Sequence, residues 1–391
     1  MKIKYSLVAL FALSNISFVN AQSLENAIKN VETSGTVAYR YNDYEASTSD
    51  ANKNKSVGSD STNLYKVAIN LKSKVNDDVV FNSRFIAGNK DNAGEVGLNT
   101  QTTGDSNVDV FLSEANFAYS GLKNTIVTVG KQGIVTPFTI ARDSIGNEAT
   151  GTGLVATTHY LDMLSLTAGF YNQTNFNNND GGLDDPTGAE DLYYVTANLA
   201  IANTTIDATY ADLQEKFDAY SVGINAKYAI DQLNLNPYAR YSSLDLASTS
   251  DKNTLWKTGI DAGFGIFGAY LAYGETHKEG GTVGVDASSD SGMDDHWRVT
   301  LSGISDASVV YASVNAQVTE KINLALKYSQ LDAGADSNAT DQNEIYVQTA
   351  YKMSNNLSTY VRLGQFEVNE FYSDNSDLKS NIGRVHVQYS F

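Results

Sequence analysis

Apolar and polar residues alternate with a period of two over most of the chain. In VHVQYSF (385–391), every second residue from Val385 to Phe391 is apolar. YKVAINL (65–71) and INLALKY (322–328) repeat the pattern elsewhere in the sequence. Such runs are roughly ten residues long, which is the length that a tilted β-strand needs to cross a bilayer. The alternation predicts strands with one apolar face and one polar face.

The segments between these runs alternate between short turns and longer polar loops. The eight short turns are 75–78, 121–124, 161–163, 201–203, 230–234, 264–266, 319–321 and 353–356. The nine longer segments are 42–63, 88–107, 133–151, 173–190, 212–216, 245–253, 275–307, 332–343 and 370–380. These connections predict about 18 strands, an even number that is typical of closed outer-membrane barrels. A strand at WRVTL (297–301) would change the count or the register, and 16 strands is the alternative count.

A soluble β-sandwich is the competing fold, but it does not explain the long–short rhythm of the connections. The 391 residues contain no cysteine, so disulfides cannot stabilise an exported sandwich. A closed barrel satisfies every backbone group inside lipid and leaves no edge strand. We therefore predict an all-β, transmembrane antiparallel β-barrel with short periplasmic turns and long extracellular loops. Tyr389 and Phe391, at the end of the last strand, are predicted to act as the signal for outer-membrane assembly.

The first 21 residues are predicted to be a secretory signal peptide, which leaves residues 22–391 as the barrel domain. Lys2 and Lys4 precede an apolar run, and a small-residue cleavage site ends at Ala21. Loss of these two lysines changes the formal net charge from −18 to −20. This acidity argues against a nucleic-acid partner, which requires basic surfaces. The expected location is the bacterial outer membrane, in contact with lipid and lipopolysaccharide.

Three stretches resemble a known family. They are SLENAIKNVETSGTVAYRY (23–41), TIVTVGKQGIV (125–135) and ATGTGLVATTHYLDMLSL (149–166), and the C-terminal strand is similar as well. Together they resemble the campylobacterial (epsilonproteobacterial) major outer membrane protein family, a family of porins. The resemblance implies an 18-stranded general porin that forms homotrimers, prefers cations and holds a divalent ion in its pore.

Charged residues on the polar faces of the predicted strands are candidates for the lining of the pore. A charge that faced lipid at the bilayer midplane would cost about 2–4 kcal/mol, so these side chains are expected to face the lumen. The candidates are Arg40, Lys66, Arg84, Glu114, Lys227, Arg240, Lys327, Arg362 and Arg384.

Loop 133–151, the third long loop, is expected to fold inward and to narrow the lumen. Arg142, Asp143 and Glu148 would then place opposed charges at the constriction, where charged rings govern which ions pass. An ordinary extracellular loop is the alternative. No cofactor is expected to be required, and Ca²⁺ is the metal considered, with Asp143 and Glu148 as candidate ligands.

The sequence therefore predicts a porin for passive diffusion of ions and small hydrophilic solutes, with the cation preference that the resemblance implies. A substrate-selective or anion-selective porin is one alternative, because the arginines at positions 40, 84, 240, 362 and 384 could favour anions. A surface adhesin or structural outer-membrane protein is another. No nucleophile motif such as G-x-S-x-G occurs, so an enzyme is not expected.

Overall fold

The structure is a computed structural model that describes residues 31–48, 58–98, 108–176, 188–250, 252–371 and 376–391. The predicted signal peptide lies outside the described residues. The strands are β1 (Val31–Thr48), β2 (Gly58–Lys74), β3 (Val79–Gly88), β4 (Val96–Gly97), β5 (Asp109–Leu122), β6 (Thr125–Gly133), β7 (Thr150–Leu161), β8 (Leu164–Thr174), β9 (Leu192–Ile201), β10 (Thr204–Leu213), β11 (Phe217–Ala226), β12 (Tyr228–Ile230), β13 (Leu233–Leu246), β14 (Lys252–Phe264), β15 (Phe267–Thr276), β16 (Ala307–Gln317), β17 (Ile322–Ala333), β18 (Gln342–Lys352), β19 (Leu357–Val368) and β20 (Leu378–Ser390).

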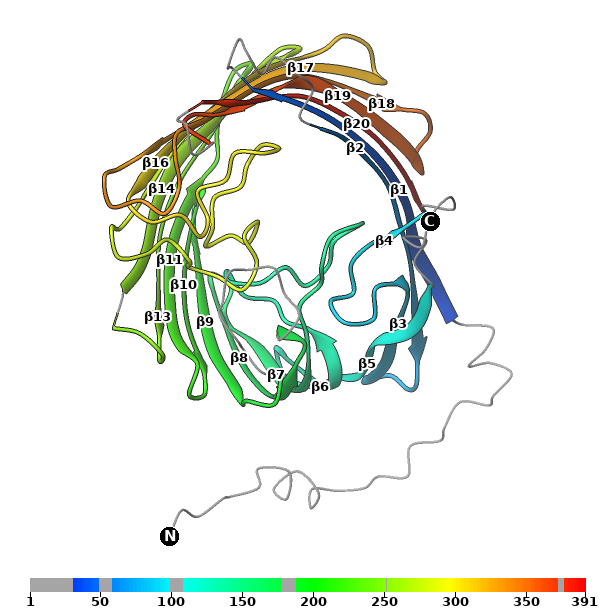
Figure 1. Cartoon of the computed structure of the whole chain (residues 1–391). Coiled ribbons are helices and arrows are strands. Elements are labelled where there is room, and N and C mark those ends of the chain that lie inside the picture. The colour runs from blue at the N-terminus through cyan, green and yellow to red at the C-terminus, as the bar shows by residue number, and fades with distance from the viewer. Residues whose placement is uncertain (1–30, 49–57, 99–107, 177–187, 251, 372–375) are drawn as a thin grey trace.

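These strands form a closed antiparallel barrel (Figure 1). β4 has two residues and pairs only with β2, and β12 continues β11 after an interruption at Lys227, so the wall consists of 18 long strands. Sequential strands pair around the wall, and β20 pairs with β1 to close it. The predicted count of 18 is therefore confirmed. In the part of the chain that the structure describes, no helix is long and apolar enough to cross a membrane.

The two faces of each strand differ as the alternation predicts. On β19, Val361 and Leu363 are exposed, whereas Phe366 and Val368 of the opposite parity are buried. Across the barrel, exposed large apolar residues include Ile206, Val222, Leu271, Leu324 and Val347. Such an extended apolar outer surface requires lipid as its solvent. The polar parity therefore faces the lumen.

The C-terminus is fixed by backbone pairing with β1. The amide of Gly35 donates to the carbonyl of Phe391 at 2.8 Å, and the amide of Phe391 donates to the carbonyl of Gly35 at 3.0 Å. A Cβ atom at position 35 would lie 2.7 Å from Cζ of Phe391, so only glycine leaves room for this ring. Tyr389 and Phe391 stack with ring centroids 5.5 Å apart on the outer face. The terminal aromatic residue thus completes the seam of the barrel.

Segment 297–301 is not a strand, although its sequence alternates. It lies in the long connection 277–306 between β15 and β16, which runs inside the barrel (Figure 1). Trp297, Val299 and Leu301 are buried against the inner wall, where they contact a core that includes Tyr311 and Tyr346. The alternation in segment 297–301 arises because one edge of an irregular loop packs on the wall, so this segment adds no strand to the count.

Candidate pore and its constriction

The connection between β6 and β7, residues 134–149, turns into the barrel and is anchored to the wall by a buried cluster of charges (Figure 1). The carboxylate of Glu148 accepts from Lys66 Nζ on β2 at 2.8 Å, and from Arg84 Nη2 and Nε on β3 at 2.6 and 3.0 Å. Side chains of Lys66 and Glu148 have no exposed surface, and that of Arg84 is 5% exposed. Lys66 also donates to the carbonyls of Asp143 and Gly146, at 2.9 Å each. Since buried charges are stable only when paired and hydrogen-bonded, this cluster favours a docked loop.

The three residues predicted for the constriction lie in different environments. Arg142 is half exposed and pairs with Glu114 on β5, with 2.9 Å between Nη2 and Oε1. Asp143 is partly exposed, and its Oδ1 accepts the backbone amides two and three residues ahead, at 2.9 and 2.8 Å. Glu148 is fully buried, so it is an anchor of the loop and cannot meet a solute in the lumen. Arg142 and Asp143 are the charges that this loop can present to the lumen.

The geometry at Asp143 and Glu148 does not fit a shared Ca²⁺ site. Ca²⁺ takes six to eight oxygen ligands. Both oxygens of Glu148 are already bonded by Lys66 and Arg84. Among the described residues, no group of three or more His, Cys, Asp or Glu side chains could hold a metal ion. These two residues give no support to the Ca²⁺ expectation, which stays a prediction.

A second loop inside the barrel, 277–306, packs against the first. The amide of Val285 donates to the carbonyl of Phe138 at 2.8 Å, and Asp286 Oδ2 accepts from the amide of Ile140 at 2.8 Å. Phe138 and Val285 belong to one buried apolar cluster with the wall. The two loops therefore form one body across part of the barrel. The sequence analysis did not predict this inward fold.

Two buried charged side chains of the wall hold the second loop. Glu344 on β18 accepts the backbone amides of Trp297 and Arg298 at 3.0 and 2.8 Å. Lys257 on β14 donates to the carbonyl of Gly292 at 2.5 Å. Neither residue was a predicted site residue. One sequence signal could have revealed this loop, namely several apolar residues in an otherwise acidic connection. These residues, all buried in the structure, are Val283, Val285, Met293, Trp297, Val299 and Leu301.

His296, in the second loop, is neutral at physiological pH. Its Nδ1 and Ser329 Oγ on β17 are 2.7 Å apart. Burial, together with the positive charges of Lys327 and Arg362, lowers the pKa of this imidazole to about 3. Protonation would therefore place a third positive charge in a partly dry environment.

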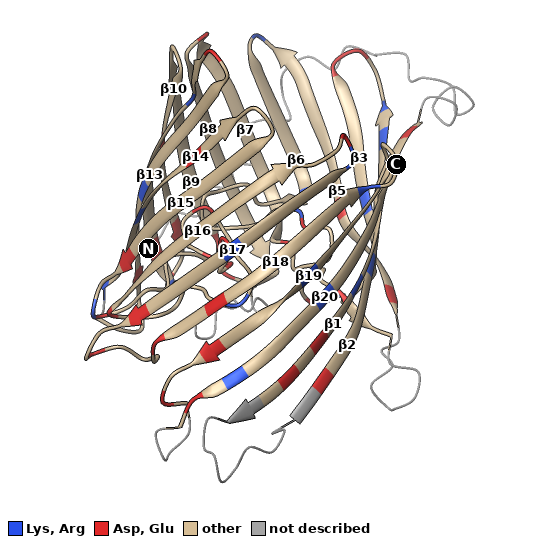
Figure 2. Ribbon diagram, turned by 90° about the horizontal axis from the view of Figure 1, so that it is seen from above, with Lys and Arg blue, Asp and Glu red and all other residues tan. Residues whose placement is uncertain are grey.

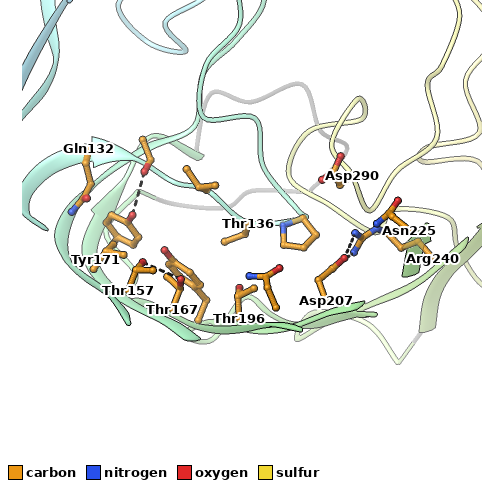
Figure 3. Close-up of a pocket in the computed structure, with 16 residues that line it drawn as sticks. Gln132, Thr136, Thr157, Thr167, Tyr171, Thr196, Asp207, Asn225, Arg240 and Asp290 are labelled. Carbon is orange, nitrogen blue, oxygen red and sulfur yellow. Dashed lines mark hydrogen bonds and ion pairs between the residues drawn. The ribbon is translucent and has the colours of Figure 1, made fainter. Parts of the chain in front are cut away.

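A polar pocket of about 530 Å³ lies between the two loops and the wall from β6 to β13 (Figure 3). Thr136 and Asp290 come from the loops, whereas the wall contributes hydroxyl and amide groups such as Thr157 and Asn225. Among the described residues, Arg240 is the only basic side chain that lines it, and it donates to both oxygens of Asp207 at 2.8 and 2.9 Å. The charge of Arg240 is thus neutralised on this side of the lumen.

The remaining predicted pore-lining cations lie on another part of the wall. Four of them have lumen-facing parity and form no ion pair with any described carboxylate: Arg40 on β1, Arg384 on β20, Arg362 on β19 and Lys327 on β17. Figure 2 shows basic segments on neighbouring strands in this region, whereas acidic segments gather toward the strand ends. Lys227 is exposed at the interruption between β11 and β12. Lys66, Arg84 and Arg240 are thus anchors that pair with carboxylates. Arg40, Arg362 and Arg384, called the unpaired group below, have no carboxylate partner among the described residues, and the same holds for Lys327.

Comparison with known proteins gives a family and a fold. A sequence profile described as "Campylobacter major outer membrane protein" matches residues 1–364. No curated protein sequence matches the chain. Among solved structures, the chain is similar to OpdL of Pseudomonas aeruginosa, with TM-score 0.71, 14% identity and coverage of 93% of this chain and 99% of that one. It is also similar to OccAB4 of Acinetobacter baumannii, with TM-score 0.69, 12% identity and coverage of 92% and 98%.

Proposed function

Since the chain belongs to the Campylobacter major outer membrane protein family, we propose that it is a passive-diffusion porin for ions and small hydrophilic solutes. The protein is an outer-membrane β-barrel with short periplasmic turns and long extracellular loops. The observation that carries the proposal is the closed wall of 18 long strands with a polar inner face. A barrel of this size encloses an aqueous channel, whereas an eight-stranded barrel is filled by side chains. Solutes move down their gradients, and the protein performs no chemical step.

For small inorganic ions, the proposed preference is for cations. The support is the formal net charge of −20 after removal of Lys2 and Lys4 with the signal peptide, because an excess of carboxylates attracts cations to the protein. Inside, Asp207 compensates the charge of Arg240, and Glu148 compensates one of the two charges of the buried pair Lys66 and Arg84. Asp143 remains as a carboxylate without an ion pair to any described residue.

An anion-selective porin is the second candidate. The observation in its favour is the unpaired group of Arg40, Arg362 and Arg384 on one part of the wall. A reversal potential that indicates anion selectivity would show that these residues determine the selectivity of the pore. A homotrimer is proposed on family membership, and contact with lipopolysaccharide follows from the outer-membrane location.

Swelling of proteoliposomes tests the porin function directly. Folded protein, identified by its heat-modifiable migration on gels, is reconstituted and diluted into isotonic solutions of neutral sugars of increasing size. We expect swelling whose rate falls steadily with sugar size and rises linearly with the gradient, because diffusion through a pore does not saturate. Vesicles with heat-unfolded protein are the control. Swelling by folded protein that is no faster than in this control, even with a pentose, would contradict the proposal.

A further inference from the structure

We propose that Arg40, Arg362 and Arg384 form a binding site for the carboxylate group of small organic anions on the lumen wall. The inference rests on the proposed porin function, because the ligand must enter the lumen. It names a solute class and a site that the family assignment does not supply. Four observations carry it: the position of the arginines, their lack of a carboxylate partner among the described residues, the orientation of Arg362 and Arg384, and the buried polar atoms around them.

The three arginines are placed side by side on consecutive strands of the wall. Arg362 on β19 is directly opposite Arg384 on β20, and Arg384 is opposite Asn42 on β1. Arg40 lies two residues before Asn42, with the same parity. Like charges directly opposite each other in a sheet are destabilising. An anion between them would relieve this repulsion.

These arginines differ from three others that face the lumen, and only Arg298 of the second loop, which lies over the rings of Tyr44 and Phe366, also has no ion pair among the described residues. Arg84, Arg142 and Arg240 each have a carboxylate partner at hydrogen-bond distance, namely Glu148, Glu114 and Asp207. Arg40, Arg362 and Arg384 form no ion pair in the described ranges. The carboxylates of Glu148, Glu114 and Asp207 thus compensate Arg84, Arg142 and Arg240, whereas nothing in the described protein compensates the three arginines of the proposed site. The unpaired group is therefore distinct, and its missing partner is the functional group that we assign to the solute.

The guanidinium groups of Arg362 and Arg384 are held in fixed orientations by hydrogen bonds of their Nε atoms and by aromatic rings. Arg384 Nε donates to Asn42 Oδ1 and Arg362 Nε donates to Gln348 Oε1, at 2.7 Å each. The guanidinium carbon of Arg384 lies 5.1 Å from the ring centre of Trp297, and that of Arg362 lies 4.7 Å from the ring centre of Tyr360. These contacts orient the planar groups and leave their terminal N–H groups for a ligand. A preorganised guanidinium fork matches a carboxylate better than any lysine can.

Several buried polar atoms around the same site have no hydrogen-bond partner within the described protein. They are Arg40 Nε, Trp297 Nε1, the hydroxyl of Tyr346 and His386 Nδ1. Each belongs to a residue next to the arginines: His386 is opposite Arg40, and the rings of Trp297 and Tyr346 lie beneath Arg362. Because most buried polar groups in proteins are satisfied, a concentration of such atoms at one site indicates a polar ligand.

The test is single-channel recording of the reconstituted full chain with benzoate and with benzamide, its neutral isostere. We expect benzoate to cause brief, concentration-dependent interruptions of the current and benzamide to cause none. The double variant Arg362→Gln/Arg384→Gln should weaken the benzoate effect about tenfold or more, since hydrogen bonds to a charged group are strong. Lys72→Gln removes the same charge from an exposed ion pair with Glu32 and should leave the benzoate effect unchanged. Arg384→Lys keeps the charge but removes the fork, and should weaken the effect.

The outcomes separate this inference from the porin function. The carboxylate site would be overturned if benzoate interrupted the current no more than benzamide does. Equal interruption by benzoate in the wild type and in the double variant would also overturn it. Both results would leave the porin function intact. Absence of conductance in folded wild-type protein would refute the porin function itself. Thermal unfolding gives an independent readout: benzoate should raise the unfolding temperature of the wild type but not that of the double variant, because a ligand that binds only the folded state stabilises it. An equal shift in both proteins, or no shift in the wild type, would count against the site.

Discussion

Replacement of Glu148 by glutamine should release the loop 134–149 from the wall. The substitution keeps the shape of the side chain but removes the only carboxylate that Lys66 and Arg84 share in the described structure. It also places an amide N–H₂ group, a donor, next to donors. Two buried cations would then remain without a counter-charge for as long as the loop stayed docked.

The expected cost is about 3–5 kcal/mol, which is typical of removing one partner from a buried ion pair. A cost of this size raises the population of the undocked loop by a factor of about 10² to 10³ or more. Lys66→Met should cost less, because Arg84 and Glu148 would still form their pair at 2.6 Å. The geometry of the cluster therefore predicts that Glu148→Gln destabilises the docked loop more than Lys66→Met does.

Single-channel recording and limited proteolysis measure this release. We expect Glu148→Gln to show a larger and noisier conductance and faster cleavage within residues 134–149. Glu32→Gln is the matched control, since it removes an ion pair with Lys72 whose side chains are 74% and 54% exposed; it should change neither readout. Conductance, noise and cleavage that match the wild type in Glu148→Gln would refute the anchoring role.

Two further predictions concern the second loop and the seam of the barrel. Burial lowers the pKa of His296 from 6.5 to about 3. The docked loop therefore binds fewer protons than the free loop between these pH values. The contribution of neutral His296 to docking is complete above about pH 6.5 and is lost as the pH falls toward 3. Current noise should therefore rise on acidification, and His296→Gln should reduce the rise; equal responses of both proteins would exclude His296 as its source. Phe391→Ser should slow assembly into the heat-modifiable form, because it removes the ring that packs over Gly35 at the seam. Pulse-chase of folding in cells measures this, and wild-type kinetics would argue against a role for the terminal ring.

The strands were predictable because a barrel imposes one periodicity on nearly every residue. An apolar side chain that faces lipid and a polar one that faces water must alternate, and a change of register by one residue reverses both faces. The eight short turns follow from the same constraint, and left-handed residues occur at several of them, including Asn124, Ala202 and Gly265. The family resemblance agreed with this pattern and was confirmed.

The interior was much less predictable, because a loop that folds onto a curved wall has no fixed period. Segment 297–301 alternates only because one edge of it packs on the wall. The sequence also identified charged residues by type, but it could not pair them across distances such as 84 to 148 or 207 to 240. Glu148 was therefore predicted at the pore constriction, although it is a buried anchor of the loop. Partners in space decide whether a lumen charge is available to a solute.

Single-channel recording of the folded wild-type protein in a planar bilayer under a KCl gradient tests the central claim most directly. The account predicts steady conductance steps, with a reversal potential of the cation-selective sign. An anion-selective sign would keep the pore and move control of selectivity to Arg40, Arg362 and Arg384. Heat-modifiable, fully folded protein that inserts and yet gives no conductance steps would contradict the claim that this barrel is an open pore.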